Sequence, residues 1–354
     1  MMKKIEEIKQ CGGIIKEGNS TYYFSNNILY IRDVNGNREY ELNDKPWEIW
    51  FAENELWLTN NNGQQITCEK CKIVADLLDL QLEYNRIYDI YKGRYLRFYN
   101  RGKNPTNGLY DLKTKEILYQ SDLFFGDFMI DNYIFQKGES LKCMDIELKK
   151  LIIDINLKEL GLEGKILIKF IGIYNESLIC FTFDYHLLQI NLKTLDYKIW
   201  NEFEIDESNI LNSKEKSQIQ TKKFYTNLSA TLIPAQKKVI GFQYEYLWEL
   251  NLETGKISSL SLKEVFKNNN ISGCWSGIAF KGDKVFFISD QSLQPNLNHK
   301  LIEFNINSHE VIDSWQLPKE RLRRGFDIYG PKIIDNNLLI AKEQNWTFHI
   351  FEIN

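Results

Sequence analysis

Two cysteines spaced like half of a zinc site form the most recognisable chemical motif in the chain. Cys68 and Cys71 lie in the segment CEKC, with two residues between them. A structural zinc ion normally needs a second pair of ligands, and no other CxxC is present. The motif does not open a helix, as a redox-active pair would. The sequence therefore predicts no metal site and no cofactor.

Histidines and carboxylates are the other groups that could do chemistry. His309 falls in a predicted turn and His349 in a predicted strand, whereas His186 and His299 fall near loops. Loop carboxylates could supply the acid and base of a glycosidase; they are Asp184, Glu245, Asp290 and Glu343. No nucleophile-elbow, HExxH, GxGxxG or P-loop pattern is present, so no catalytic residue is predicted.

Composition narrows the class of protein. The 354 residues are 43% hydrophobic, enough for a sizeable core, and the net charge of −4 lacks the basic excess of a nucleic-acid binder. No segment approaches the roughly 18 apolar residues of a membrane helix, and the start MMKKIEEIKQ lacks the apolar stretch of a secretory signal. We therefore expect no membrane or nucleic-acid partner, a cytoplasmic location and free thiols.

A repeated hairpin positions all of these residues. The template is NLETGKI from Asn251: an Asx residue, an apolar residue, a short turn and a second strand. The Asx side chain can bind backbone amides of the turn, and Gly255, Gly36 and Asn37 suit turn positions with positive φ. Further copies start at Asp33, Thr67, Asp111, Asp145, Asn191, Asn305 and, at the end of the chain, Glu352. In the copy from Thr67, CEKC becomes the turn of such a hairpin.

A second hairpin precedes each copy, so each repeat has four strands, A to D in chain order. Repeated four-stranded units of about 40 to 50 residues are typical of β-propeller blades. The last repeat lacks strand D, and residues 3–10 form an unassigned strand that could complete it and close the ring. We predict eight blades in one domain, 1–354, with seven as the alternative. The approximate blades are 12–42, 48–77, 86–120, 123–155, 166–200, 224–260, 274–315, and 324–354 plus 3–10.

On these repeats the chain resembles the β-propeller superfamily, with WD-type, quinoprotein-type and YVTN-type repeats. The resemblance covers nearly the whole sequence. It carries no signature of one family, such as a GH…WD pattern or a kelch double glycine. It therefore implies an all-β propeller of antiparallel four-stranded blades and brings no catalytic residue with it.

The variable loops are the predicted site. The A–B and C–D turns are short and uniform, whereas the B–C and D–A loops differ in length and composition, and function concentrates in such loops. Their aromatic and arginine content is typical of binding hot spots, although aromatic residues also pack between blades. The predicted partner-binding residues are Trp47, Tyr185, Tyr244, Tyr246, Trp275, Arg321, Arg323, Arg324 and Trp346.

Two functions are consistent with these features. The favoured one is a non-catalytic scaffold that binds another protein through its variable loops, such as a bacterial immunity-type or regulatory protein. Abundant Lys, Asn and Ile favour a bacterial source. The alternative is a hydrolase or lyase that acts on a small molecule or glycan through loop carboxylates. A structural repeat within a larger assembly is a third possibility.

Overall fold

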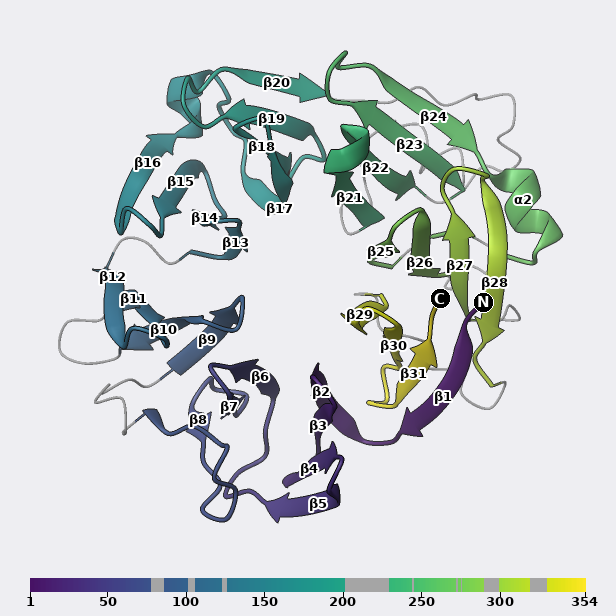
Figure 1. Ribbon diagram of the computed structural model, residues 1–354. Coiled ribbons are helices and arrows are strands. Elements are labelled where there is room, and N and C mark those ends of the chain that lie inside the picture. Colours follow the sequence, from purple (N-terminus) through teal and green to yellow (C-terminus); the bar gives the residue numbers. More distant parts are fainter. Residues whose placement is uncertain are drawn as a thin grey trace. The chain divides into compact units, whose positions relative to one another are not determined.

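The computed structural model describes most of the chain (Figure 1). The described residues are 1–77, 86–100, 106–122, 126–200, 229–243, 245–271, 273–274, 276–289, 299–318 and 330–354. They form two compact units, which we describe separately. The first comprises Met1–Glu7, Lys137–Leu141 and Ile155–Asn354, and the second comprises Ile8–Gln136 and Lys142–Asp154.

The first unit contains four antiparallel sheets of four strands each. Three are built from consecutive strands: β17 (Leu167–Tyr174), β18 (Ser177–Thr182), β19 (Leu187–Asn191) and β20 (Tyr197–Trp200); β21 (Ala230–Ile233), β22 (Lys238–Gln243), β23 (Tyr246–Asn251) and β24 (Ile257–Ser261); and β25 (Ala279–Lys281), β26 (Lys284–Ile288), β27 (Lys300–Asn305) and β28 (Glu310–Gln316). The fourth has the order β29 (Lys332–Asp335), β30 (Leu338–Lys342), β31 (Phe348–Glu352) and β1 (Lys3–Ile8).

The second unit holds the other four sheets, with β15 and β16 each extending by two residues into the first unit. Their strands are β2 (Cys11–Glu17), β3 (Ser20–Ser25), β4 (Ile28–Asp33) and β5 (Gly36–Glu41); β6 (Glu48–Ala52), β7 (Glu55–Thr59) and β8 (Gln65–Ile66); β9 (Arg86–Tyr91), β10 (Tyr95–Asn100), β11 (Thr106–Asp111) and β12 (Glu116–Ser121); and β13 (Phe128–Ile130), β14 (Tyr133–Gln136), β15 (Ser140–Asp145) and β16 (Lys150–Asn156).

The chain is an eight-bladed β-propeller, which confirms the prediction of eight blades over seven. Strand β1 lies beside β31 and completes the last blade (Figure 1), as predicted for residues 3–10. The prediction of one domain over 1–354, with its approximate blade boundaries, stays a prediction.

The second blade departs from the predicted pattern. The copy from Thr67 is not a C–D hairpin, because strand C ends after Ile66 and residues 73–75 return parallel to β7. The Leu56 amide donates to the Ile73 carbonyl, and the Ala75 amide donates to the Leu56 carbonyl. Burial of Cys68 and Cys71 in the core explains the change, because it draws the turn inward.

The Asx residue of the repeat holds the C–D turn, as predicted. The Oδ1 atom of Asn251 accepts hydrogen bonds from the amides of Glu253 and Thr254, at 3.0 and 2.9 Å. Asp111, Asn191 and Asn305 bind the amides two and three residues ahead in the same way. Such side chains satisfy turn amides that no strand can pair.

The apolar residue after the Asx residue has a role that the sequence pattern does not reveal. The amide of Leu252 donates to the carbonyl of Lys237, the residue directly before strand B, at 2.9 Å. This bond, which we call the turn clasp, ties the C–D turn to the A–B turn of the same blade. Equivalent bonds join Leu112 to Arg94, Ile146 to Asn132, Leu192 to Glu176, Ile306 to Asp283, and Ile353 to Asn337.

The fourth residue after the Asx residue adopts positive φ. Gly255 does so at φ +70°, as predicted, and Gly36 also has positive φ, whereas Asn37 lies in extended strand β5. Non-glycine residues take the position of Gly255 in other blades. They are Lys115, Lys149, Leu195 and His309, with φ between +52° and +64°. Strain at this position is therefore tolerated in several turns.

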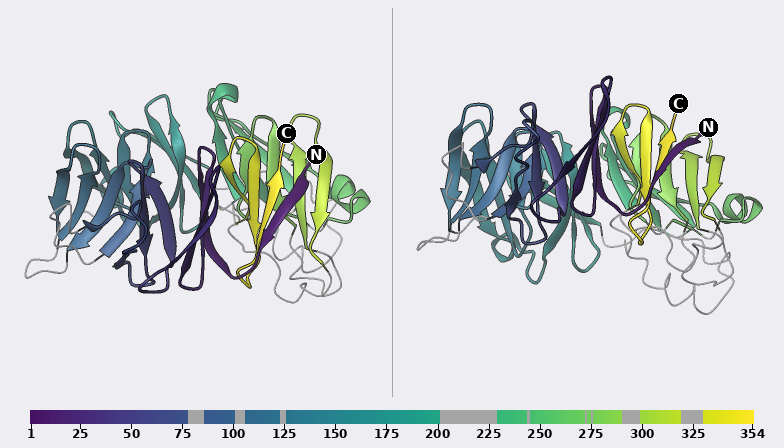
Figure 2. Two further views of the ribbon diagram at one scale, coloured as in Figure 1. Left: turned by 60° about the horizontal axis from the view of Figure 1, so that its bottom comes forward. Right: turned by 90° about the horizontal axis from the view of Figure 1, so that it is seen from below.

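Aromatic and aliphatic side chains fill the core of each unit. Trp248 is fully buried and meets Phe181 of the preceding blade edge to face, with ring centroids 6.4 Å apart. Two short helical segments occur among the strands, the 3₁₀ turn η2 (Leu157–Leu160) and helix α2 (Lys263–Asn268), which lies beside β28 (Figure 2). Within the described ranges, no helix has the length and apolar character needed to cross a membrane.

Reciprocal substitutions at the positive-φ turn position should have opposite effects. Gly255→Ala should lower the free energy of unfolding by about 1 kcal/mol, because alanine resists positive φ. The added Cβ would meet Trp200 only at an ordinary 3.8 Å, so no clash contributes. Leu195→Gly should raise the same free energy or leave it unchanged. Urea denaturation followed by tryptophan fluorescence checks both, and a larger loss for Leu195→Gly would contradict the turn assignment.

Acid should destabilise the C–D turn of the third blade by protonating the carboxylate of Asp111. Arg94 donates two hydrogen bonds to this buried carboxylate, at 2.8 and 2.6 Å, and they lower its pKa. A depressed carboxyl pKa contributes stability that is present above the ordinary value near pH 4 and lost as pH falls through the folded value. Asp111→Asn should lower the free energy of unfolding at pH 7 by about 1–3 kcal/mol. The variant should also lose less of its free energy of unfolding than the wild type when the pH falls below about 4. The prediction is wrong if both proteins lose the same amount.

Candidate functional site

The predicted site residues belong to the B–C and D–A loops, which share one edge of each blade, the loop edge. The opposite edge, with the A–B and C–D turns, is the turn edge. Tyr185 and Trp346 lie on B–C loops of the first unit, and Trp47 lies on a D–A loop of the second. Five predicted residues fall outside the described part of the chain: Tyr244, Trp275, Arg321, Arg323 and Arg324.

The described aromatic residues differ in exposure. Trp47 is 48% exposed and Trp346 is 36% exposed, so both present surface to solvent. Tyr185 is half-buried. Tyr246 begins strand β23 and is only 4% exposed, because it packs in the core against Phe181 and its neighbours. Tyr246 therefore offers a partner almost no surface, and its aromatic ring serves packing.

Three B–C loops share one backbone conformation, which we call the five-residue loop. Two backbone hydrogen bonds close this loop. The amide of the first residue donates to the carbonyl of the fifth, and the amide of the fourth residue donates to the carbonyl of the first. The loops are residues 60–64, 182–186 and 343–347, with bonds of 2.8–3.0 Å. The fourth residue has positive φ in each loop: Gly63 at +73°, Tyr185 at +67° and Trp346 at +66°.

Large aromatic residues occupy the position that suits glycine best. Gly63 takes it in one loop, whereas Tyr185 and Trp346 take it in the other two. Elsewhere in the described chain, non-glycine residues with positive φ are mostly Lys, Asn, Asp, Glu and Gln, and none is Phe, Tyr or Trp. Bulky residues held in this region signal strain, and strain of this kind concentrates at functional sites.

Polar contacts fix the loop around Tyr185. Lys165, from the preceding D–A loop, donates from Nζ to Asp184 Oδ2 and to His186 Nδ1, the latter at 2.6 Å. Thr182 Oγ1 donates to Asp184 Oδ1 at 2.6 Å and accepts from the His186 amide at 3.1 Å. Contacts between two loops of the same blade region therefore hold the segment around Tyr185 in place.

The hydrogen bonds of this cluster lower the pKa of Asp184. Partial burial alone would raise the pKa of Asp184, but hydrogen bonds from Lys165 and Thr182 bring it below its ordinary value. His186 Nδ1 lies 2.6 Å from Lys165 Nζ and 3.2 Å from Asp184 Oδ2. The histidine therefore flanks the Lys165–Asp184 salt bridge within the loop that presents Tyr185.

Sequence reasoning missed several residues of the loop edge. Phe183, in the same loop as Tyr185, is 66% exposed. Lys342 places its ammonium 3.9 Å from the centroid of the Trp346 ring, within cation–π range. Phe183 carried a signal, since it is a large apolar residue directly beside the loop aspartate Asp184. The Lys165 and Lys342 contacts had none, because they depend on three-dimensional packing.

The histidines, carboxylates and cysteines that could do chemistry lie in different parts of the fold. His349 and Glu343 are both fully buried and lie beside each other, His309 lies in a turn of the turn edge, and Asp290 falls outside the described residues. Burial raises the pKa of the Cys71 thiol. In the described ranges, no group of three or more His, Cys, Asp or Glu side chains is arranged to hold a metal ion.

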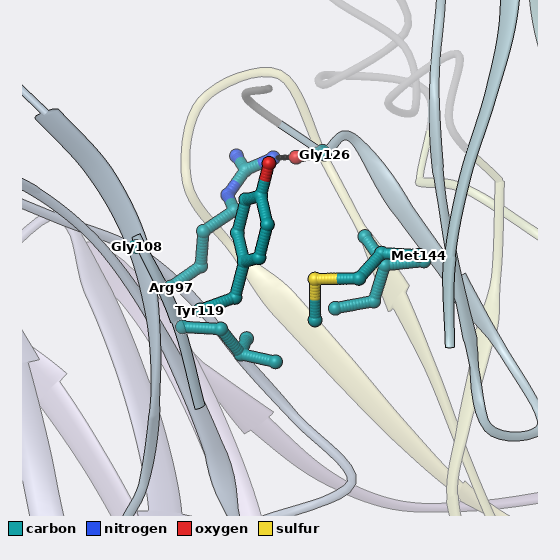
Figure 3. Close-up of a pocket in the computed structure, with 7 residues that line it drawn as sticks. Arg97, Gly108, Tyr119, Gly126 and Met144 are labelled. Atoms are coloured by element: carbon teal, nitrogen blue, oxygen red, sulfur yellow. Dashed lines mark hydrogen bonds between the residues drawn. The ribbon is translucent and has the colours of Figure 1, made fainter. Parts of the chain in front are cut away.

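A niche in the second unit opens between two neighbouring blades (Figure 3). Its apolar wall is made by Leu109, Ile134 and Met144, which all belong to a buried core cluster. Arg97 and Tyr119 lie side by side at its polar end, where Arg97 donates to the Gly126 carbonyl (Figure 3). This niche is therefore a gap in core packing with a polar rim, and it presents no carboxylate pair.

Solved structures with the same fold are distant in sequence. The chain is similar to BamB from Moraxella catarrhalis, with a TM-score of 0.58, 10% sequence identity and coverage of 100% of this chain and 98% of that chain. It is also similar to Sqt1 from Saccharomyces cerevisiae, with a TM-score of 0.61, 8% identity and 99% coverage of both chains. Both are β-propeller proteins. No protein-family model and no curated protein matches the sequence.

At Tyr185 and Trp346, substitution by glycine should leave the protein more stable than substitution by alanine. Alanine is usually the more stabilising of the two residues, but positive φ reverses the order. We expect Tyr185→Gly to exceed Tyr185→Ala in free energy of unfolding by about 1 kcal/mol, and the same for the pair at Trp346. Thermal and urea denaturation of the four variants check this. An alanine variant that equals its glycine counterpart would show that these loops carry no strain.

Proposed function

We propose that this protein is a non-catalytic scaffold that binds another protein through its loop edge. The observation that carries the proposal is the presence of Tyr185 and Trp346 at strained positions where Gly63 serves in a third loop. Strain at bulky residues costs stability and concentrates at functional sites, which supports a use for these two aromatic rings at the loop edge. Tyrosine and tryptophan dominate the energetics of protein interfaces.

The surroundings of the two rings fit this use. Phe183 adds exposed apolar surface next to Tyr185, and Lys342 lies against the Trp346 ring. Lys165 and Asp184 hold the Tyr185 loop in one conformation before any partner arrives. Pre-organised aromatic side chains lose little entropy on binding. The propeller fold is consistent with a binding role.

The finer parts of the proposal rest on the sequence. We place the protein in the bacterial cytoplasm as an immunity-type or regulatory partner of another protein. Trp47 of the second unit stays a predicted partner-binding residue, as do Trp275 and Arg323, which lie outside the described ranges. The carboxylates of the alternative, a hydrolase or lyase, do not favour it: Glu343 is fully buried and Asp184 is engaged by Lys165.

Glycine variants allow the proposal to be tested without loss of fold. Tyr185→Gly and Trp346→Gly remove the rings at positions where glycine is strain-free, so folding should be retained. In affinity capture from the native source, proteins retained by the wild type should be lost by both variants. With the purified partner, Kd should rise about tenfold or more for each variant.

Leu195→Gly is the matched control. It removes a large side chain at the same kind of backbone position, in the same blade as Tyr185 but on the turn edge. This variant should retain the captured protein with unchanged Kd. A partner that binds the wild type and all three variants equally would overturn the proposal, and so would loss of binding in the control alone.

A further inference from the structure

A fully buried acid–histidine pair connects the last five-residue loop to its blade. Glu343 opens the loop that presents Trp346, and its Oε1 atom lies 2.5 Å from Nε2 of His349 in strand β31. The Glu343 amide and carbonyl also make both backbone bonds that close the loop. The conformation of the loop is therefore tied to the state of His349.

The other nitrogen of His349 faces strand β1. Its Nδ1 atom lies 3.7 Å from Glu7 Oε2, and Lys4 Nζ pairs with the same carboxylate oxygen at 2.7 Å. Trp315 of β28 packs against the imidazole, with centroids 4.8 Å apart, and Lys4 lies 4.9 Å from the centroid of the Trp315 ring. One histidine thus contacts both the Trp346 loop and the strand that completes the blade.

Burial and the charged groups around His349 together determine its pKa. The charged groups that act on the ring are Glu343 from the loop, with Glu7 and Lys4 from β1. Burial and Lys4 lower the pKa of His349, and this outweighs the two carboxylates, which raise it. A lowered histidine pKa favours the neutral ring in the closed structure. Stability from this site is then present above the ordinary pKa near 6.5 and lost as pH falls through the folded value.

Strand β1 is the element that can detach when His349 is protonated. It is the outer strand of its sheet and hydrogen bonds to β31 alone in that sheet. Its residues from Lys3 to Glu7 are exposed or half-buried and only Ile8 is buried, so its release exposes little core. Release would give the imidazole access to water, where its charged form is stable. Local opening of an edge strand costs less than unfolding of the whole unit.

We propose that His349 is a pH-sensitive latch that holds strand β1 and the Trp346 loop in place when neutral and releases them when protonated. The latch adds regulation to the molecule and does not depend on the protein-binding proposal. The ring adjoins the loop through Glu343 at Nε2 and adjoins β1 through Glu7 near Nδ1.

Hydrogen–deuterium exchange of the whole chain, between pH 7.5 and pH 5.0, tests the latch. After correction for intrinsic exchange, amides of β1 and of residues 343–347 should lose about tenfold in protection for each pH unit between the ordinary histidine pKa near 6.5 and the lower folded pKa, as expected for one proton, and the loss should level off below the folded pKa. Amides of β18 and β19, in another blade of the same unit, should keep their protection. His349→Gln retains a donor for Glu343 but cannot become charged, so its β1 protection should not vary over this range.

His309→Gln is the matched control, because His309 lies in a turn on the opposite edge. It should behave as the wild type. A second readout uses the wild type alone: the imidazole proton resonances of His349 should titrate at the pH where the loss of β1 protection levels off. The latch is overturned if the wild type shows no loss, if His349→Gln shows the same loss, if all blades lose protection together, or if these two pH values differ.

Discussion

The pairing of β1 with β31 is the constraint on which the last blade depends. In the other described sheets, neighbouring strands follow one another along the chain, so each blade forms from local contacts. Only the sheet of β29, β30 and β31 needs a strand from the opposite end of the sequence. Contacts between distant segments form late and slowly, because the intervening chain must be ordered first. Stability of this blade therefore depends on the rest of its unit being folded.

Side chains support this pairing with charge as well as packing. Lys4 and Glu7 form an ion pair on β1, and the pair reaches Trp315 and His349 on two different strands. A charged edge strand also discourages pairing with other molecules. The same residues thus fasten the strand and protect it from aggregation.

Much of the architecture could be predicted from the sequence. The Asx–apolar repeat led to the prediction of eight blades, because each hairpin is encoded by local alternation and turn chemistry. The copy from Thr67 failed because its cysteines are small and apolar enough to enter the core, which a turn template does not register. Clasp bonds such as Leu252 to Lys237 were also beyond the sequence, since they join turns through backbone atoms.

The candidate site was only partly readable. Loop position pointed to Tyr185 and Trp346, but it pointed equally to Tyr246, whose ring packs inward. What distinguishes them is φ, a property of the folded backbone that composition cannot supply. Cross-loop contacts such as that between Lys165 and His186 likewise exist only once the blade has formed.

The turn clasp has a consequence for how much of such a sequence can diverge. Where the clasped C–D turn forms, it needs a carboxylate or amide side chain, one apolar neighbour and a residue that tolerates positive φ, while the clasp itself uses main-chain atoms. Only a few positions of such a turn are therefore restricted, and each is restricted to a chemical class rather than to one amino acid. Sequence comparison counts identical letters, so a chain built under these rules can share its architecture with proteins to which it is 8–10% identical.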